Sequence, residues 1–174
     1  ALDPNDRRAQ EQLKKRFIAL GAWDDLETFY ADGGKWDELI RVLEREAENP
    51  QVAVDVKVKL LFKMAELWRD RKEKLDRAAR CYERVRELDP ANAEAAAALV
   101  PIYQKANDPK KLAAVLEVQL ANAQEREDRV ALLCEVAALY EKKTGEPIKA
   151  FEHYSTAFGL NATDDAIRDA LERV

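Results

Sequence analysis

Apolar residues along this 174-residue chain recur mostly at intervals of three and four, the spacing that places them on one face of an α-helix. One stretch, VAVDVKV at 52–58, alternates apolar and polar residues, but it continues into KLLFKMAELW, whose spacing is helical. Glycine, proline and short polar side chains separate the helical stretches. Because the connecting loops are short, neighbouring helices are expected to run antiparallel. The predicted helices cover residues 7–20, 24–32, 36–48, 53–71, 74–88, 92–106, 109–123, 127–143, 147–159 and 164–173.

A long repeat underlies this pattern. MAELW at 64–68 matches VAALY at 136–140, and the same offset of 72 residues aligns Ala78 with Ala150 and Tyr82 with Tyr154. In a second comparison, FYADGGKWDELIRVLE matches IYQKANDPKKLAAVLE at an offset of 73 residues. Each long unit holds four predicted helices, so the elementary step is a pair of helices of about 36 residues.

A shorter duplication interrupts the repeat. GAWDDL at 21–26 returns as GKWDEL at 34–39, 13 residues later. The phrase ALDPND at 1–6 precedes the similar ELDPAN at 87–92 by 86 residues, which exceeds the offset of 73 by the same 13. We therefore predict an irregular insertion of 13 residues near 22–34, which forms a short extra helix. The insertion is either a tolerated bulge or an acidic partner surface, whose residues would be Trp23, Asp24, Asp25 and Phe29.

The stretch LDRAARCYERVRELDPANAEA at 75–95 resembles the second helix and exit of a tetratricopeptide repeat. The family places a small residue at the position of Ala78, an aromatic at Tyr82 and a proline at Pro90. Small residues let two antiparallel helices approach closely, and aromatics fill the space to the next pair. One departure is the step of 13 residues from Ala65 to Ala78, which is one longer than usual in the family and recurs between the aligned alanines at 137 and 150.

This resemblance implies a fold and a domain organisation. The fold would be all-α, a right-handed α-solenoid of antiparallel tetratricopeptide-like helix pairs with about nine to ten helices. Residues 1–174 would form a single repeat domain. Because the chain opens in the middle of a repeat phrase, we expect it to be a segment of a longer protein.

Charge changes the picture of possible partners. The formal net charge is −5 and the isoelectric point is near 5.2, which argues against nucleic acid, since binding to phosphates needs a basic face. The charge is also uneven: residues 22–50 sum to −6 and residues 55–88 to +4. Neighbouring helices of opposite sign usually attract each other weakly across a solvated surface. A patch that steers a partner is the alternative.

The residue types that carry chemistry are sparse. The two cysteines form no CxxC motif and the chain has one histidine, so neither a metal site, a cofactor nor a disulfide framework is expected. His153 aligns with Cys81, which indicates a tolerant, partly exposed position. Cys134 aligns with Phe62 and is interpreted as a small apolar residue, with a reactive thiol as the alternative. An enzyme is therefore not expected. There is also no membrane-length apolar run and no signal peptide, which favours the cytoplasm.

By resemblance to the family, the first helix of each pair would line a concave groove that binds a protein or peptide. Its centre would be small and apolar, which suits an extended or helical apolar segment. The sequence thus predicts a non-catalytic scaffold or adaptor. The alternatives are an architectural spacer or self-association segment of a large multidomain protein, with exposed terminal helices as contacts, and a regulatory module tethered to an enzyme. The candidate groove residues are Lys59, Phe62, Glu66, Arg69, Glu94, Ala97, Pro101, Gln104, Ala131, Cys134, Ala138 and Glu141.

Overall fold

The computed structural model describes residues 7–174, which form ten α-helices and two π-helical turns with no strand among them. The predicted all-α architecture is confirmed, and each predicted helix has a counterpart whose ends differ by at most two residues, once the π-helical turns are counted with the helices they extend. The phrase ALDPND at residues 1–6 lies outside the described part. The chain divides between Glu73 and Lys74 into two compact units.

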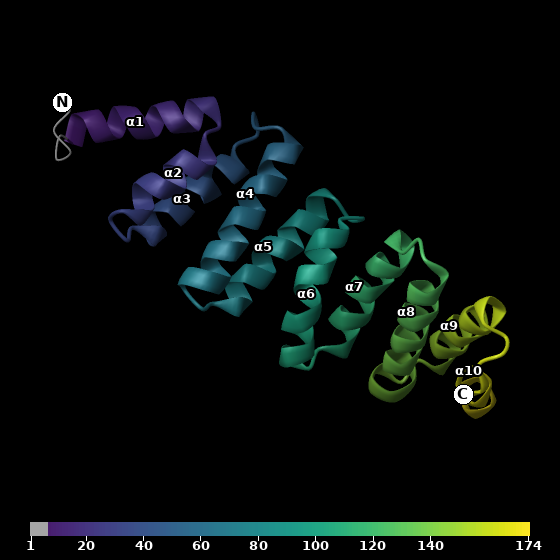
Figure 1. Cartoon of the computed structure of the whole chain (residues 1–174). Helices are drawn as coiled ribbons and strands as arrows, with labels where there is room; N and C mark the ends of the chain where they lie inside the picture. The colour runs from purple at the N-terminus through teal and green to yellow at the C-terminus, as the bar shows by residue number, and fades with distance from the viewer. Residues whose placement is uncertain (1–6) are drawn as a thin grey trace. The chain divides into compact units, whose positions relative to one another are not determined.

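In the first unit, each helix packs on the next one in the chain (Figure 1). Leu26, Leu39, Leu43 and Leu60 are fully or almost fully buried, and they come from three different helices. Helical spacing of these leucines therefore produces the packed face that the apolar pattern predicts. The elements are α1 (Arg7–Leu20), α2 (Trp23–Ala31), α3 (Trp36–Glu48), α4 (Val54–Glu66) and the π-helical turn η1 (Leu67–Arg71), which continues α4.

The second unit continues in the same manner, with each helix packed on its successor from α5 to α10. Small buried residues, among them Ala96, Ala113, Ala137 and Ala150, allow these helices to approach closely. The elements are α5 (Leu75–Leu88), α6 (Ala93–Ala106), α7 (Pro109–Asn122), α8 (Arg126–Leu139), the π-helical turn η2 (Tyr140–Thr144), α9 (Pro147–Leu160) and α10 (Asp165–Arg173).

The doubled phrases begin with the same turn. Gly21 and Gly34 both have positive φ angles, 64° and 62°, and each follows the last turn of a helix. The next amide donates to the carbonyl oxygen five residues earlier, from Ala22 to Phe17 at 2.9 Å and from Lys35 to Tyr30 at 3.0 Å. This left-handed cap satisfies carbonyls that the helix end leaves open, and glycine adopts it without a Cβ penalty.

Asn92 and Asp108 cap the N-termini of α6 and α7 with their side chains. Asn92 Oδ1 accepts a hydrogen bond from the amide of Ala95, and Asp108 Oδ1 accepts one from the amide of Lys111. Pro109 then occupies the first turn of α7, where a missing amide hydrogen costs little. These caps place the starts of α6 and α7 within a residue of their predicted positions.

Candidate partner-binding surfaces

The predicted groove residues of the first unit lie on one face of α4 and its π-helical continuation. Lys59, Glu66 and Arg69 are exposed, and Phe62 is half-buried. Arg69 forms a bidentate ion pair with the adjacent Asp70, with Nε–Oδ1 at 2.7 Å and Nη2–Oδ2 at 2.8 Å. The guanidinium at this end of the face is therefore partly engaged by the chain's own carboxylate.

On α6 the four predicted residues form an exposed row. Glu94, Ala97, Pro101 and Gln104 are all exposed, and they follow one another at helical spacing. The opposite side of the same helix is buried through residues such as Leu99. The helix runs without interruption through Pro101. α6 thus presents an open strip of mostly small or uncharged side chains.

The row on α8 is open at one end and occupied at the other. Ala131 is exposed, whereas Cys134 packs against a cluster that includes Ile167 of α10. Glu141, in η2, accepts two hydrogen bonds from Arg173 of α10, with Nε–Oε1 at 2.7 Å and Nη2–Oε2 at 3.0 Å. The final helix of the chain therefore lies against this part of the predicted groove.

The structure shows the surroundings of Cys134 and His153, the two residues whose side chains could be reactive. Burial, together with the negative charge of Asp164, raises the pKa of the Cys134 thiol, which disfavours the reactive thiolate. The Nδ1 atom of His153 lies 2.8 Å from the carbonyl oxygen of Lys149, one turn earlier in α9. Within residues 7–174, no group of three or more His, Cys, Asp or Glu side chains is arranged to hold a metal ion.

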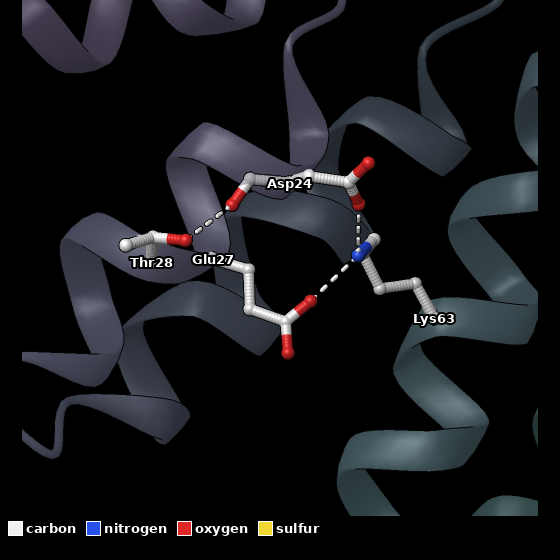
Figure 2. Close-up of polar contacts among 4 residues, drawn as sticks. All are labelled: Asp24, Glu27, Thr28 and Lys63. Atoms are coloured by element: carbon white, nitrogen blue, oxygen red, sulfur yellow. Dashed lines mark hydrogen bonds and ion pairs between the residues drawn. The ribbon is translucent and has the colours of Figure 1, made fainter.

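The acidic surface predicted near 22–34 lies on α2, and part of it contacts α4 (Figure 2). Lys63 Nζ of α4 lies 2.8 Å from Asp24 Oδ1 and 2.6 Å from Glu27 Oε2. The Lys63 side chain is 19% exposed and Glu27 is 30% exposed, whereas Asp24 is 96% exposed. Burial opposes the charge on Lys63, but its two carboxylate partners prevail and raise its pKa. Lys63 therefore joins α2 to α4 through two acids.

Further contacts of the same kind link the acidic and basic segments of the first unit. Lys72 Nζ lies 2.9 Å from a carboxylate oxygen of Asp37. The guanidinium of Arg71 lies 4.9 Å from the centre of the Trp36 ring, a distance at which cation–π attraction operates. The uneven charge in the sequence is thus used, at least in part, to hold neighbouring helices together. Of the predicted acidic surface, Asp25 is exposed, and Phe29 contacts Tyr30 edge to face.

Two polar clusters recur in the second unit. Tyr103 donates to Glu83 Oε1 at 2.7 Å, and Lys111 Nζ lies 5.4 Å above the Tyr103 ring. In the next pair, Tyr140 donates to Glu117 Oε1 at 2.6 Å, and Lys149 Nζ lies 4.9 Å above the Tyr140 ring. Each cluster joins three successive segments of the chain, with the tyrosine in the middle. The sequence comparison aligned Tyr103 with Tyr30 but did not identify these clusters.

A hollow of about 310 Å³ lies beside the first cluster. It is lined by Glu83, Arg86, Glu87, Tyr103, Lys111 and Ala114. None of these residues was a sequence-predicted site residue. The signal in the sequence was weak, because arginine and glutamate on a helix normally indicate a solvated face.

The comparisons with known proteins address the fold. A tetratricopeptide repeat model matches residues 17–50, a range that contains α2 and α3 and both doubled phrases. A comparison with curated protein sequences finds no match. Among solved structures, the crystal structure of MamA matches with a TM-score of 0.43 and 17% identity, over 82% of this chain and 78% of that chain.

The family match over residues 17–50 and the all-helical architecture both agree with the resemblance to tetratricopeptide repeats that the sequence shows. The predicted all-α architecture of successively packed helices is confirmed within each of the two units. In the described part of the chain, no helix is both long and apolar enough to cross a membrane.

Proposed function

We propose that this chain, a helical repeat protein of the tetratricopeptide type, is a non-catalytic scaffold that binds a protein or peptide segment along the first helices of its pairs. Tetratricopeptide repeats typically mediate contacts between proteins, and this general role fits the chain. The finer part of the proposal is the surface used. We place this surface on α6 and on the open end of α8. We also propose that the protein is cytoplasmic, as the sequence predicts.

The observation that carries the proposal is the exposed row on α6. Ala97 and Pro101 lie at its centre, flanked by Glu94 and Gln104, and all four side chains are exposed. Small side chains leave the backbone accessible and cost little entropy when a partner covers them. An apolar segment with polar flanks would fit such a strip, in the manner of a helix laid in a groove.

Capture experiments with matched variants test this surface. Ala97→Glu combined with Ala131→Glu adds charge at exposed positions of α6 and α8, and Ala121→Glu adds it at an exposed position of α7. We expect the first variant to lose partners that wild type and the α7 variant both retain, with unchanged circular dichroism and melting. Equal capture by all three proteins would refute the α6–α8 surface.

Self-association is a second candidate, favoured by exposed apolar residues on the first helix. Leu20 is 69% exposed and Leu13 is 40% exposed, and both lie on α1. Large exposed apolar side chains that gather on one terminal helix are typical of a contact surface. Analytical ultracentrifugation tests it: Leu13→Glu with Leu20→Glu should shift an oligomer to monomer, and Leu88→Glu should not. A wild-type chain that stays monomeric at all concentrations would exclude this candidate.

A further inference from the structure

The helices α3, α5, α7 and α9 occupy alternate places in the repeat, and the start of α9 differs from the other three. The fifth residue of these helices is Ile40, Ala79, Ala113 and Phe151 in turn. The first three side chains are buried, whereas Phe151 is 51% exposed. A position that is covered elsewhere in the repeat is therefore open to solvent in α9, and it carries the largest side chain.

The second residue of the same helices differs as well. It is Asp37, Asp76 and Lys110 in the first three helices and Ile148 in α9. Ile148 is 76% exposed, the most exposed large apolar residue in the described part of the chain. Because residues three apart are neighbours on a helix surface, Ile148 and Phe151 form one apolar patch, which we call the α9 patch. Exposed apolar residues that gather in this way are typical of a contact surface.

The α9 patch is open because α10 ends before it. Arg173, the last residue of α10, donates to Glu141, which also accepts a hydrogen bond from the Tyr154 hydroxyl. The end of α10 thus lies level with Tyr154, and Phe151 is almost one turn nearer to the start of α9. Along α3 and α7, the following helix continues into a π-helical turn that packs on them, η1 and η2 respectively. α10 spans nine residues and carries no such turn.

Charges of opposite sign flank the α9 patch. Lys142 and Lys143 are exposed in η2, which leads into α9. Asp169 and Glu172 are exposed on α10, which packs on α9. A partner of one sign would be attracted by one flank and repelled by the other. A second copy of the same surface, related by a two-fold axis, offers each flank the opposite charge.

We propose that the α9 patch is the centre of a symmetric contact between two copies of this chain. The two patches pack on each other, and the basic flank of each copy faces the acidic flank of the other. Two large apolar side chains from each copy make a small contact, so the dimer is weak and its population depends on the protein concentration.

This contact is separate from the surfaces proposed above. It lies within the second unit and shares no residue with the exposed row of α6, so it stands or falls independently of the scaffold function. It is an alternative to self-association through Leu13 and Leu20 of α1, and one experiment separates the two.

Sedimentation velocity of the whole chain over a range of concentrations is that experiment. Ile148→Glu with Phe151→Glu places charge at two exposed positions, so circular dichroism and melting should not change, and we expect the dimer to be lost. Leu88→Glu adds charge at an exposed leucine of α5 and should retain the dimer. The α1 variant, Leu13→Glu with Leu20→Glu, should retain it too.

Charge reversal tests the pairing of the flanks. Lys142→Glu with Lys143→Glu should raise the dissociation constant of the dimer about tenfold or more, and Asp169→Lys with Glu172→Lys should do the same. All four substitutions together should restore it, because both flanks are then reversed. A wild-type chain that stays monomeric, a dimer that survives in the α9 variant or is lost in the α1 variant, or a fourfold variant that fails to dimerise would overturn the proposal.

Discussion

The hydroxyl of Tyr103 donates a 2.7 Å hydrogen bond to Glu83, which lies on α5, so that a residue near the end of α6 is tied to the preceding helix. Tyr140 makes the corresponding bond to Glu117 of α7 at 2.6 Å. Both tyrosines are buried, at 5% and 7% exposure, and each acceptor is a glutamate side-chain oxygen. These bonds therefore recur from one helix pair to the next as a polar counterpart of the apolar packing.

The first prediction concerns the strength of this tie. Tyr103→Phe keeps the ring and removes the hydroxyl, which leaves one acceptor site of Glu83 unfilled. We expect a loss of about 1–1.5 kcal/mol in the free energy of unfolding, measured by urea denaturation. Tyr154→Phe is the matched control, since its bond to Glu141 is longer at 3.2 Å, and it should cost less. An equal or greater loss in the control would contradict a special role for the Tyr103 bond.

The second prediction concerns alkaline pH. Burial and the hydrogen bond to a glutamate raise the pKa of Tyr103 and of Tyr140 well above the ordinary value of 10.0. The folded chain thus holds these protons more tightly than the unfolded chain. Their contribution to stability is complete below pH 10 and falls as the pH rises above it.

The Tyr103→Phe, Tyr140→Phe double variant isolates this effect from the lysines that titrate in the same range. Its free energy of unfolding should decline less steeply above pH 10 than that of wild type, measured by denaturation at a series of pH values. Parallel curves for the two proteins would show that the tyrosines do not contribute.

The helix pattern of this chain was predictable, because it depends on local spacing and on caps. Residues such as Asp108, Pro109 and Gly34 mark helix ends through their own side chains or backbone freedom. The sequence could not predict how side chains on different helices are positioned relative to one another. The sequence does not distinguish Arg86 from the other arginines of α5, whereas in the structure its Nε atom is buried without a hydrogen-bond partner among the described residues.

One irregularity was visible in the sequence without its cause. The steps from Ala65 to Ala78 and from Ala137 to Ala150 are each one residue longer than the family's usual step. The structure places a π-helical turn within each step, η1 and η2, and a π-helical turn absorbs one extra residue. The insertion near 22–34 stays a prediction; these residues form α2 and lie within the matched repeat.

The third prediction follows from the π-helical turn η2. The amide of Glu146 donates to the carbonyl of Tyr140 six residues earlier, whereas Asp108 donates to Tyr103 five residues earlier. Deletion of the exposed Lys143 would place this amide five residues after the Tyr140 carbonyl, as in the Asp108–Tyr103 bond. We therefore expect the free energy of unfolding to fall by less than about 1 kcal/mol.

Deletion of the exposed Lys105 in α6 is the control for this experiment, because α6 has no π-helical turn to absorb the change. It removes one residue between Tyr103 and Asp108, whose side chain caps α7, and should lower the free energy of unfolding by about 2 kcal/mol or more. Similar melting temperatures for the two deletions would contradict the assignment of the extra residue to η2.

The fourth prediction concerns the ion pairs of Figure 2. Lys63→Met keeps much of the side-chain volume but leaves Glu27 without this partner. We expect the free energy of unfolding to fall by about 1 kcal/mol, and by less at high salt. Asp24→Asn should have a smaller effect than Glu27→Gln, because Asp24 is 96% exposed and Glu27 is 30% exposed. Chemical denaturation at two salt concentrations measures both, and the reverse order would contradict this account of the link.

The central claim is that a partner lies along the exposed row of α6, and site-specific photocrosslinking tests it most directly. A benzophenone side chain is placed at position 97 on α6 or, as the control, at position 121 on α7, both of which are exposed alanines. After irradiation in cells, mass spectrometry identifies any protein joined to the chain. The account predicts a defined covalent adduct from position 97 and none from position 121. Adducts from position 121 with none from position 97 would contradict it.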